Sequence, residues 1–206
     1  MPCLYFTDKP NTQQKALLMP AWNIPILLTW LRILLIPLFT VLFYLPAGWL
    51  NNTEINWFAA FLFAAAAITD WFDGYLARKW HQTSDFGAFL DPVADKLMVV
   101  VALILLVSIG RTYAIFAMII IGREITISAL REWMAQLGKR SSVAVAQIGK
   151  LKTTAQMVAI LLLLIYDIPW LGINLIWLGN VFMLIAAILT LWSMFYYLKM
   201  AMKEFR

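Results

Sequence analysis

The sequence predicts an all-α integral membrane protein: a bundle of six transmembrane helices with its active site on the cytoplasmic side. Three observations lead to this fold class. The 206 residues are 63% hydrophobic and only 13% charged, against about 25% charged residues in ordinary globular domains. Apolar stretches long enough to cross a bilayer alternate with short polar segments. Basic residues gather in every second connection, as they do on the cytoplasmic side of membrane proteins.

The first half of the chain predicts three spans, over residues 27–46, 57–78 and 90–110. The first follows from residues 33–53, which carry no charge, and Pro37 and Pro46 are expected to kink and end it. The polar segment 48–54 predicts a short loop before the second span. The second span ends, and the third begins, in charged residues, which are joined by the polar link 79–85.

The second half predicts three further spans, over residues 113–136, 153–166 and 168–198. Gly110 is expected to begin a tight turn into the fourth span, which Arg123 and Glu124 interrupt. Asp167-Ile-Pro169 is expected to turn the chain after the fifth span. The residues that follow are uncharged and numerous enough for one long, tilted sixth span.

The distribution of basic residues predicts the orientation. With both termini in the cytoplasm, the outer loops hold only Arg111, and the other Lys and Arg residues of the connections lie inside. We divide the chain into an N-terminal cytoplasmic or juxtamembrane segment, residues 1–22, and a membrane domain, residues 23–206. The net charge of +5 does not indicate a nucleic-acid partner, because the basic residues flank apolar spans and form no basic face.

Four aspartates at the junction of the second and third spans are the strongest functional signal. Asp70 and Asp73 are three residues apart on one helix, and Asp91 and Asp95 are four apart on the next, so each pair shares a helical face. The two helices are consecutive and antiparallel, so the pairs can face one pocket. Four carboxylates cannot all stay ionised so close together without cations. Hard divalent ions fit this donor set, with Mg²⁺ the usual one beside phosphates, and four carboxylates can hold two ions.

Small and basic residues accompany the aspartates. Gly74 and Ala77 leave room for a ligand to approach the backbone, and Arg78 can neutralise a phosphate. The alternative is that the aspartates cap helices and pair with Arg78, Lys79 and Lys96. That alternative suits any single aspartate but is disfavoured for four at this spacing, because ionisable residues at membrane depth are usually functional.

The pattern Asp70-x2-Asp73-Gly74-x2-Ala77-Arg78-x8-Gly87-x3-Asp91-x3-Asp95 matches the signature of the CDP-alcohol phosphotransferases without a departure. Further segments resemble one bacterial branch of that family, over about residues 20–200. They include Asn23-Ile-Pro25-x3-Thr29-x2-Arg32, Phe86-Gly-Ala-Phe-Leu-Asp-Pro-Val-Ala-Asp-Lys96 and Gly149-Lys-Leu-Lys-Thr-Thr-Ala-Gln156.

The resemblance implies a reaction and roles for these residues. Enzymes of this branch transfer the phosphatidyl group of CDP-diacylglycerol to the 1-hydroxyl of sn-glycerol 3-phosphate and release CMP. It implies a homodimer in the bacterial inner membrane with two Mg²⁺ or Mn²⁺ ions. It assigns metal binding to Asp70, Asp73, Asp91 and Asp95, with Asp95 also the general base. It assigns contacts to CDP-diacylglycerol to Thr29, Gly74, Arg78 and Ser84.

An acceptor that carries a phosphate needs a second anion site. Arg123, Arg131, Lys150 and Lys152 all come from the cytoplasmic side of the fourth and fifth spans, and their convergence would form it. The alternative for the lysines is that they only obey the preference for basic cytoplasmic segments. For Arg123 the alternative is an ion pair with an acidic residue. Glu124 is expected to be a poor partner, because adjacent helical residues do not face each other.

Two rival functions stay open at this point. The same chemistry could use another acceptor, namely inositol, inositol phosphate, serine or phosphatidylglycerol, because the aspartate pattern alone does not separate these. A divalent-cation carrier could use the aspartates as a transit site. The carrier is disfavoured because all four aspartates lie at one face of the membrane, whereas carriers usually bind near its midplane.

Overall fold

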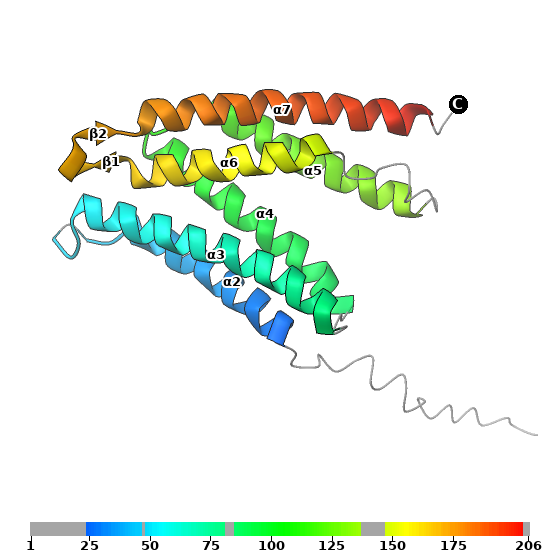
Figure 1. Cartoon of the computed structure of the whole chain (residues 1–206), viewed down its shortest axis with the longest axis horizontal. Coiled ribbons are helices and arrows are strands. Elements are labelled where there is room, and N and C mark those ends of the chain that lie inside the picture. The colour runs from blue at the N-terminus through cyan, green and yellow to red at the C-terminus, as the bar shows by residue number, and fades with distance from the viewer. Residues whose placement is uncertain (1–23, 47, 81–84, 137–146, 204–206) are drawn as a thin grey trace, which may run out of the picture.

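The computed structural model describes residues 24–46, 48–80, 85–136 and 147–203. Within these ranges the side chains of residues 24–28, 70–80, 85–92, 95, 147–150 and 203 are not described. The described chain forms six α-helices and one short hairpin (Figure 1). The helices are α2 (Ile24–Leu42), α3 (Asn52–Trp80), α4 (Asp85–Ser108), α5 (Ala114–Gln136), α6 (Gln147–Ile165) and α7 (Ile176–Lys203). The predicted helical fold is confirmed; the N-terminal segment 1–22 lies outside the described residues.

The helices pack as two antiparallel pairs, which are joined mainly by the packing of α3 against α6. Helices α6 and α7 lie side by side along the upper edge of Figure 1, and α2 and α3 form the second pair below them. Helix α4 packs against α2 and α3 at one end and approaches α5 and α6 at the other, while α5 packs along α7. The C-terminal end of α3 and the start of α4 therefore lie together, at the lower right of Figure 1.

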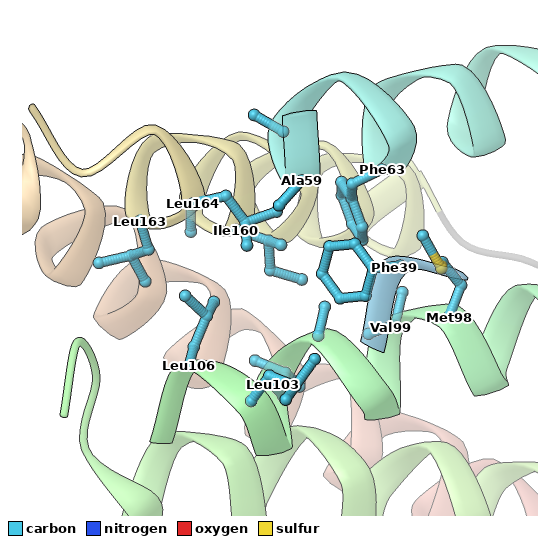
Figure 2. Close-up of a cluster of buried hydrophobic side chains, with 14 of the residues drawn as sticks. Phe39, Ala59, Phe63, Met98, Val99, Leu103, Leu106, Ile160, Leu163 and Leu164 are labelled. Atoms are coloured by element: carbon cyan, nitrogen blue, oxygen red, sulfur yellow. The ribbon is translucent and has the colours of Figure 1, made fainter. Parts of the chain in front are cut away.

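All six described helices contribute buried side chains to the main core. Figure 2 shows Phe39 of α2, Phe63 of α3, Leu103 of α4 and Ile160 of α6 directed toward one another. The rings of Phe39 and Phe63 have centroids 6.5 Å apart. Helix α3 also contributes alanines to this core. Alanines let neighbouring helices approach closely, as small residues do in membrane helix bundles. The buried alanines of α3 are Ala59, Ala60 and Ala66.

Local hydrogen bonds explain where two helices end or begin. After α4, the amide of Gly110 donates to Val107 O at 3.0 Å, and the amide of Arg111 donates to Leu106 O at 2.9 Å. This is a Schellman motif, and it requires the positive φ of 70° that Gly110 adopts. The predicted tight turn is confirmed. Before α3, Glu54 Oε2 accepts from the Asn51 amide at 2.8 Å, one half of a capping box.

Three predicted boundaries are wrong. Helix α2 ends at Leu42, before Pro46, which was expected to end the first span. The loop expected over residues 48–54 stops at Asn51, because Glu54 in the first turn of α3 accepts from the Asn51 amide and stabilises the helix start. The sixth span does not begin at residue 168. Instead β1 (Asp167–Ile168) and β2 (Ile173–Asn174) form a hairpin around the 3-10 helix η2 (Pro169–Leu171). Gly172, with φ at 64°, ends that turn, so α7 begins only at Ile176.

Arginine 111, in the connection between α4 and α5, ties several elements together at the end of the bundle opposite the α3–α4 junction. Its guanidinium donates to Asn56 Oδ1 at 2.6 Å and to the backbone oxygens of Leu163 and Leu164 at 3.2 and 2.9 Å. It also lies 4.5 Å from the centroid of the Tyr166 ring. Burial lowers the pKa of Arg111, and Tyr166 and Asp167 oppose that shift. We call this set of contacts the Arg111 clasp.

The backbone of Arg111 extends the clasp to α7. Asn180 Nδ2 donates to Arg111 O at 2.9 Å, and Thr112 Oγ1 donates to Asn180 Oδ1 at 3.0 Å. The positive guanidinium lies against the C-terminal carbonyls of α6, where a helix dipole favours a cation. Side chains and backbone of one short connection thus hold α3, α6 and α7.

Apolar surface covers much of the described molecule. Over the described residues, one helical stretch, Ile176–Met202, is long and apolar enough to cross a membrane. Three shorter apolar stretches are Thr29–Leu42, Lys96–Ser108 and Leu151–Ile165. They are shorter because one end of each helix carries charged residues or lies among side chains that are not described. Large apolar side chains are nevertheless exposed on every helix, for example Leu34, Phe61, Ile104, Met118, Leu151 and Trp177.

Candidate active site

The aspartate frame lies on two neighbouring helices, as predicted. Asp70 and Asp73 are in the C-terminal half of α3, and Asp91 and Asp95 are in the first turns of α4. Both stretches are helical, so the three- and four-residue spacings do place each pair on one face. The side chains of these aspartates, and of Gly74 and Arg78 on α3, lie outside the description. That all four carboxylates face one pocket stays a prediction.

A cavity of about 580 Å³ lies beside this junction. Its volume is in the range of ordinary small-molecule sites. Ala66 and Ala67 form its wall one turn before Asp70, and Lys96, the residue after Asp95, contributes a cation. Its polar lining residues are Arg32, Lys96, Glu124, Thr153, Thr154 and Gln156. Five helices therefore supply this cavity, next to the aspartate-bearing ends of α3 and α4.

An ion cluster joins α5 to α6 at the cavity wall. The carboxylate oxygen Oε1 of Glu124 accepts hydrogen bonds from Lys152 Nζ and, at 3.2 Å, from Arg123 Nη1. Lys152 is only 1% exposed, and Arg123 is 7% exposed. A buried cation needs a partner of opposite charge. Glu124 is that partner for both, and it is the member of the trio that lines the cavity.

The expectation that Glu124 would not pair with Arg123 is wrong. Adjacent residues on a helix do diverge at Cβ, but the two long side chains bend back toward each other. The physical reason lies on α6: Lys152 draws the Glu124 carboxylate into the bundle, where Arg123 Nη1 reaches it. The tertiary contact thus outweighs the local geometry of α5.

Helix α7 holds the other side of Arg123. The buried residues of α5 recur every three or four positions, and Arg123 belongs to that stripe together with Ile120 and Ile127. Its Nη2 donates to Ser193 Oγ at 3.3 Å. Arg131 joins through Tyr197 of α7, since the guanidinium carbons of both arginines lie 5.7 Å from that ring centroid. Arg123, Arg131 and Lys152 therefore belong to one connected cluster.

A second contact links the aspartate helix to this cluster. Lys96 Nζ donates to Ser128 Oγ, and Ser128 Oγ donates to the backbone oxygen of Glu124 at 2.8 Å. Ser128 thereby holds the Lys96 ammonium at the cavity, one residue from Asp95. The described cluster contains Lys96, Arg123, Arg131 and Lys152 against one carboxylate, and this excess of positive charge suits an anionic ligand.

The other predicted binding residues have different outcomes. Thr29 is buried on α2, one turn before the buried Arg32, which lines the cavity. Thr29 itself does not line it. Lys150 is in the first turn of α6, but its side chain lies outside the description, and Ser84 lies wholly outside the described residues. Among side chains that are described, no group of three acidic, histidine or cysteine residues could hold a metal.

None of the six polar cavity residues was among the site residues predicted from the sequence, and three of them, Lys96, Glu124 and Gln156, differ in the signal they offered. Glu124 had a usable signal, because it is an acidic residue within an apolar span. Lys96 directly follows the last aspartate of the frame, which is a weaker signal. Gln156 closes the segment Gly149–Gln156 that resembles the family branch, but only the packing shows that it borders a cavity.

Comparison with known proteins defines the class. The chain belongs to the CDP-alcohol phosphatidyltransferase family, which it matches over residues 22–192. It is 52% identical to the CDP-diacylglycerol–glycerol-3-phosphate 3-phosphatidyltransferase of Escherichia coli (strain K12) over 182 residues, which are 87% of this chain and 95% of that protein. The enzyme of the same name from Salmonella typhimurium is 53% identical, and that of Shigella flexneri 52%, over the same shares.

Proposed function

We propose that this protein transfers the phosphatidyl group of CDP-diacylglycerol to sn-glycerol 3-phosphate, giving phosphatidylglycerophosphate and CMP. The observation that carries the proposal is the identity of 52–53% over 87% of the chain to enzymes named for this reaction. The cavity beside the aspartate frame, with cations from α4, α5 and α6 around it, supports the proposal because both substrates are anionic.

The chemistry is a displacement at phosphorus. The oxygen of the acceptor 1-hydroxyl forms a bond to the phosphorus of the phosphatidyl group, and the bond from that phosphorus to the CMP oxygen breaks. CMP leaves with the electron pair, and the hydroxyl proton passes to the Asp95 carboxylate, the proposed general base. Thr29, Gly74, Arg78 and Ser84 are proposed to hold CDP-diacylglycerol so that the leaving oxygen is opposite the attacking one.

The four aspartates are proposed to hold divalent cations, two Mg²⁺ or Mn²⁺ ions. The donor set fits, because carboxylate oxygens are the ligands these ions prefer and the helical spacing puts each pair on one face. When bound, such ions neutralise charge on the diphosphate and make CMP a better leaving group. Asp70 and Asp73 come from α3, and Asp91 and Asp95 from α4, so binding would also hold the two helices together.

The acceptor phosphate is proposed to bind at the cluster of Arg123, Arg131 and Lys152, with Lys150 beside it. Arg123 and Lys152 share Glu124 as their partner, and this carboxylate stands between them and the cavity. The described cations of this cluster outnumber its one described carboxylate. A phosphate dianion would supply the negative charge that balances them. The arrangement favours a phosphorylated acceptor over inositol or serine, which carry no phosphate.

The proposed location is the bacterial inner membrane, with six spans and both termini in the cytoplasm. The exposed apolar side chains on all described helices support embedding in lipid. Basic residues support the orientation: the described Arg32, Lys96, Arg123, Arg131 and Lys152 lie around the aspartate end, whereas Arg111 lies at the other. We also propose a homodimer, which cross-linking in membranes would test.

The decisive experiment measures CMP released by detergent-purified protein from CDP-diacylglycerol with Mg²⁺. Parallel reactions contain sn-glycerol 3-phosphate, inositol, inositol phosphate, serine or phosphatidylglycerol. We expect release with glycerol 3-phosphate, and loss of release in Asp95→Asn. Asp85→Asn is the matched control, because Asp85 is on the same helix but outside the four-aspartate frame. Release with another acceptor alone would overturn the substrate, and folded protein that releases no CMP would favour the carrier.

A further inference from the structure

A buried oxygen without a partner lies in the cavity wall. Gln156 of α6 is 4% exposed and lines the cavity, and its Oε1 has no hydrogen-bond partner among the described residues. A buried carbonyl oxygen left in this state is unfavourable, and most such groups in proteins are paired. The side chain reaches the cavity wall, so a rotation of its terminal amide would turn this buried acceptor toward a donor from a ligand.

The position of Gln156 narrows the choice of ligand. It lies four residues after Lys152, so the two share one face of α6. Lys152 bonds Glu124, which lines the same cavity, and Thr153 lies in the wall as well. Gln156 is therefore about one helical turn, roughly 6 Å along the helix axis, from Lys152, the proposed phosphate-binding cation. The proposed nucleotide contacts come instead from α2, α3 and the α3–α4 link.

The acceptor offers the donor that this oxygen lacks. In the proposed reaction the 1-hydroxyl of sn-glycerol 3-phosphate reacts and the phosphate is bound by cations, which leaves the C2 hydroxyl between them. We propose that Gln156 accepts a hydrogen bond from this C2 hydroxyl and thereby selects glycerol phosphate over acceptors that lack it. This inference rests on the proposed function. A site built to bind a hydroxyl rejects an analogue without one, because its own polar group then stays unpaired.

The test compares sn-glycerol 3-phosphate with 3-hydroxypropyl phosphate, which has the same reacting hydroxyl and phosphate but no C2 hydroxyl. The readout is the ratio of kcat/KM for the two acceptors, measured by CMP release. We expect the wild-type protein to prefer glycerol 3-phosphate by about tenfold or more. Gln156→Met keeps the length of the side chain but removes its acceptor, and we expect it to bring the ratio to within about twofold of one.

Thr190→Val is the matched control. Thr190 of α7 also has a buried oxygen without a hydrogen-bond partner among the described residues, but it does not line the cavity. We expect Thr190→Val to keep the wild-type acceptor ratio. Gln156→Asn serves as a second variant if the methionine protein does not fold; its shortened amide should lower the ratio as well.

A second pair of substrates tells whether Gln156 contacts the acceptor or the ribose of the donor. CDP-diacylglycerol and its 2′-deoxyribose form are compared with glycerol 3-phosphate held constant. A change in this ratio in Gln156→Met, with the acceptor ratio unchanged, would assign the oxygen to the ribose and overturn the inference. So would a wild-type protein that uses both acceptors equally well. If the wild-type protein releases no CMP with glycerol 3-phosphate, the proposed function itself fails, and the inference fails with it.

Discussion

The Glu124 carboxylate of α5 accepts a hydrogen bond from the Lys152 ammonium of α6, and only the acidic member of this pair borders the cavity. Lys152 is almost completely buried, whereas the Glu124 side chain is 21% exposed. The cation is thus held by a residue that is itself in reach of a ligand. Changes at Glu124 consequently act both on the stability of the α5–α6 contact and on the charge of the cavity wall.

The first prediction is that Glu124→Gln destabilises the protein. The change leaves Lys152 buried without an anion and weakens the hydrogen bond that Arg123 Nη1 donates to Oε1 of residue 124. Breaking a buried ion pair from one side costs about 3 kcal/mol. We expect a lower midpoint of thermal unfolding in detergent. The double variant Lys152→Met, Glu124→Gln should recover part of the lost stability. If the double variant lost more stability than the two single variants together, the pairing would be contradicted.

The second prediction concerns metal removal. Because four aspartates are proposed to hold divalent ions that stabilise the transition state by several kcal/mol, EDTA should abolish CMP release and added Mg²⁺ or Mn²⁺ should restore it. Asp73→Asn should lower the rate by about 100-fold or more and raise the Mg²⁺ concentration needed for half-maximal release. Full activity in EDTA would rule out the proposed metal site.

The third prediction tests the Arg111 clasp. Arg111→Met leaves Asn56 and the last carbonyls of α6 without their donor, which costs about 1–3 kcal/mol. Arg111→Lys keeps the charge but not the fork of donors, and we expect an intermediate stability. The clasp is at the far end from the aspartates, so the folded fraction of each variant should keep the KM for glycerol 3-phosphate. A raised KM would show that the clasp also shapes the cavity.

The fourth prediction concerns the close contact between α6 and α7. A Cβ at Gly179 would come within 2.7 Å of Cγ and Cδ2 of Leu163. We therefore expect Gly179→Ala to destabilise the protein by about 1–3 kcal/mol, measured by thermal unfolding in detergent. Gly122 of α5 is the control, because a Cβ there meets nothing within 4 Å. Gly122→Ala should leave stability unchanged or raise it by up to about 1 kcal/mol, since alanine favours a helix.

The sequence was sufficient to predict helix type and order because long apolar runs separated by polar links leave few alternatives. The helix ends were less predictable. Glu54 is read as a loop residue from composition, yet it lies in the first turn of α3, where its carboxylate accepts from the Asn51 amide. The turn at Asp167-Ile-Pro169 was predicted, but the rest of the hairpin lies in an uncharged stretch, where charge gives no signal and Gly172 marks the end of the turn.

The parts of the candidate site that follow from local spacing along one helix were predictable. The parts that depend on packing between helices were not. The aspartate frame follows from three- and four-residue helical spacing, and its helices are confirmed. The pairing of Arg123 with Glu124 was predicted wrongly, because it depends on Lys152, which is 28 residues away in sequence. Gln156 likewise becomes a candidate only from the packed structure, in which it lines the cavity.

The Arg111 clasp also determines where the bundle can move. It fastens α3, α6 and α7 at one end, so any displacement of these helices relative to one another is restrained most strongly there. The largest displacement then falls at the opposite end, where the aspartates and the cavity lie. A lipid donor that enters between helices would therefore spread the bundle at the proposed site and leave the fastened end intact.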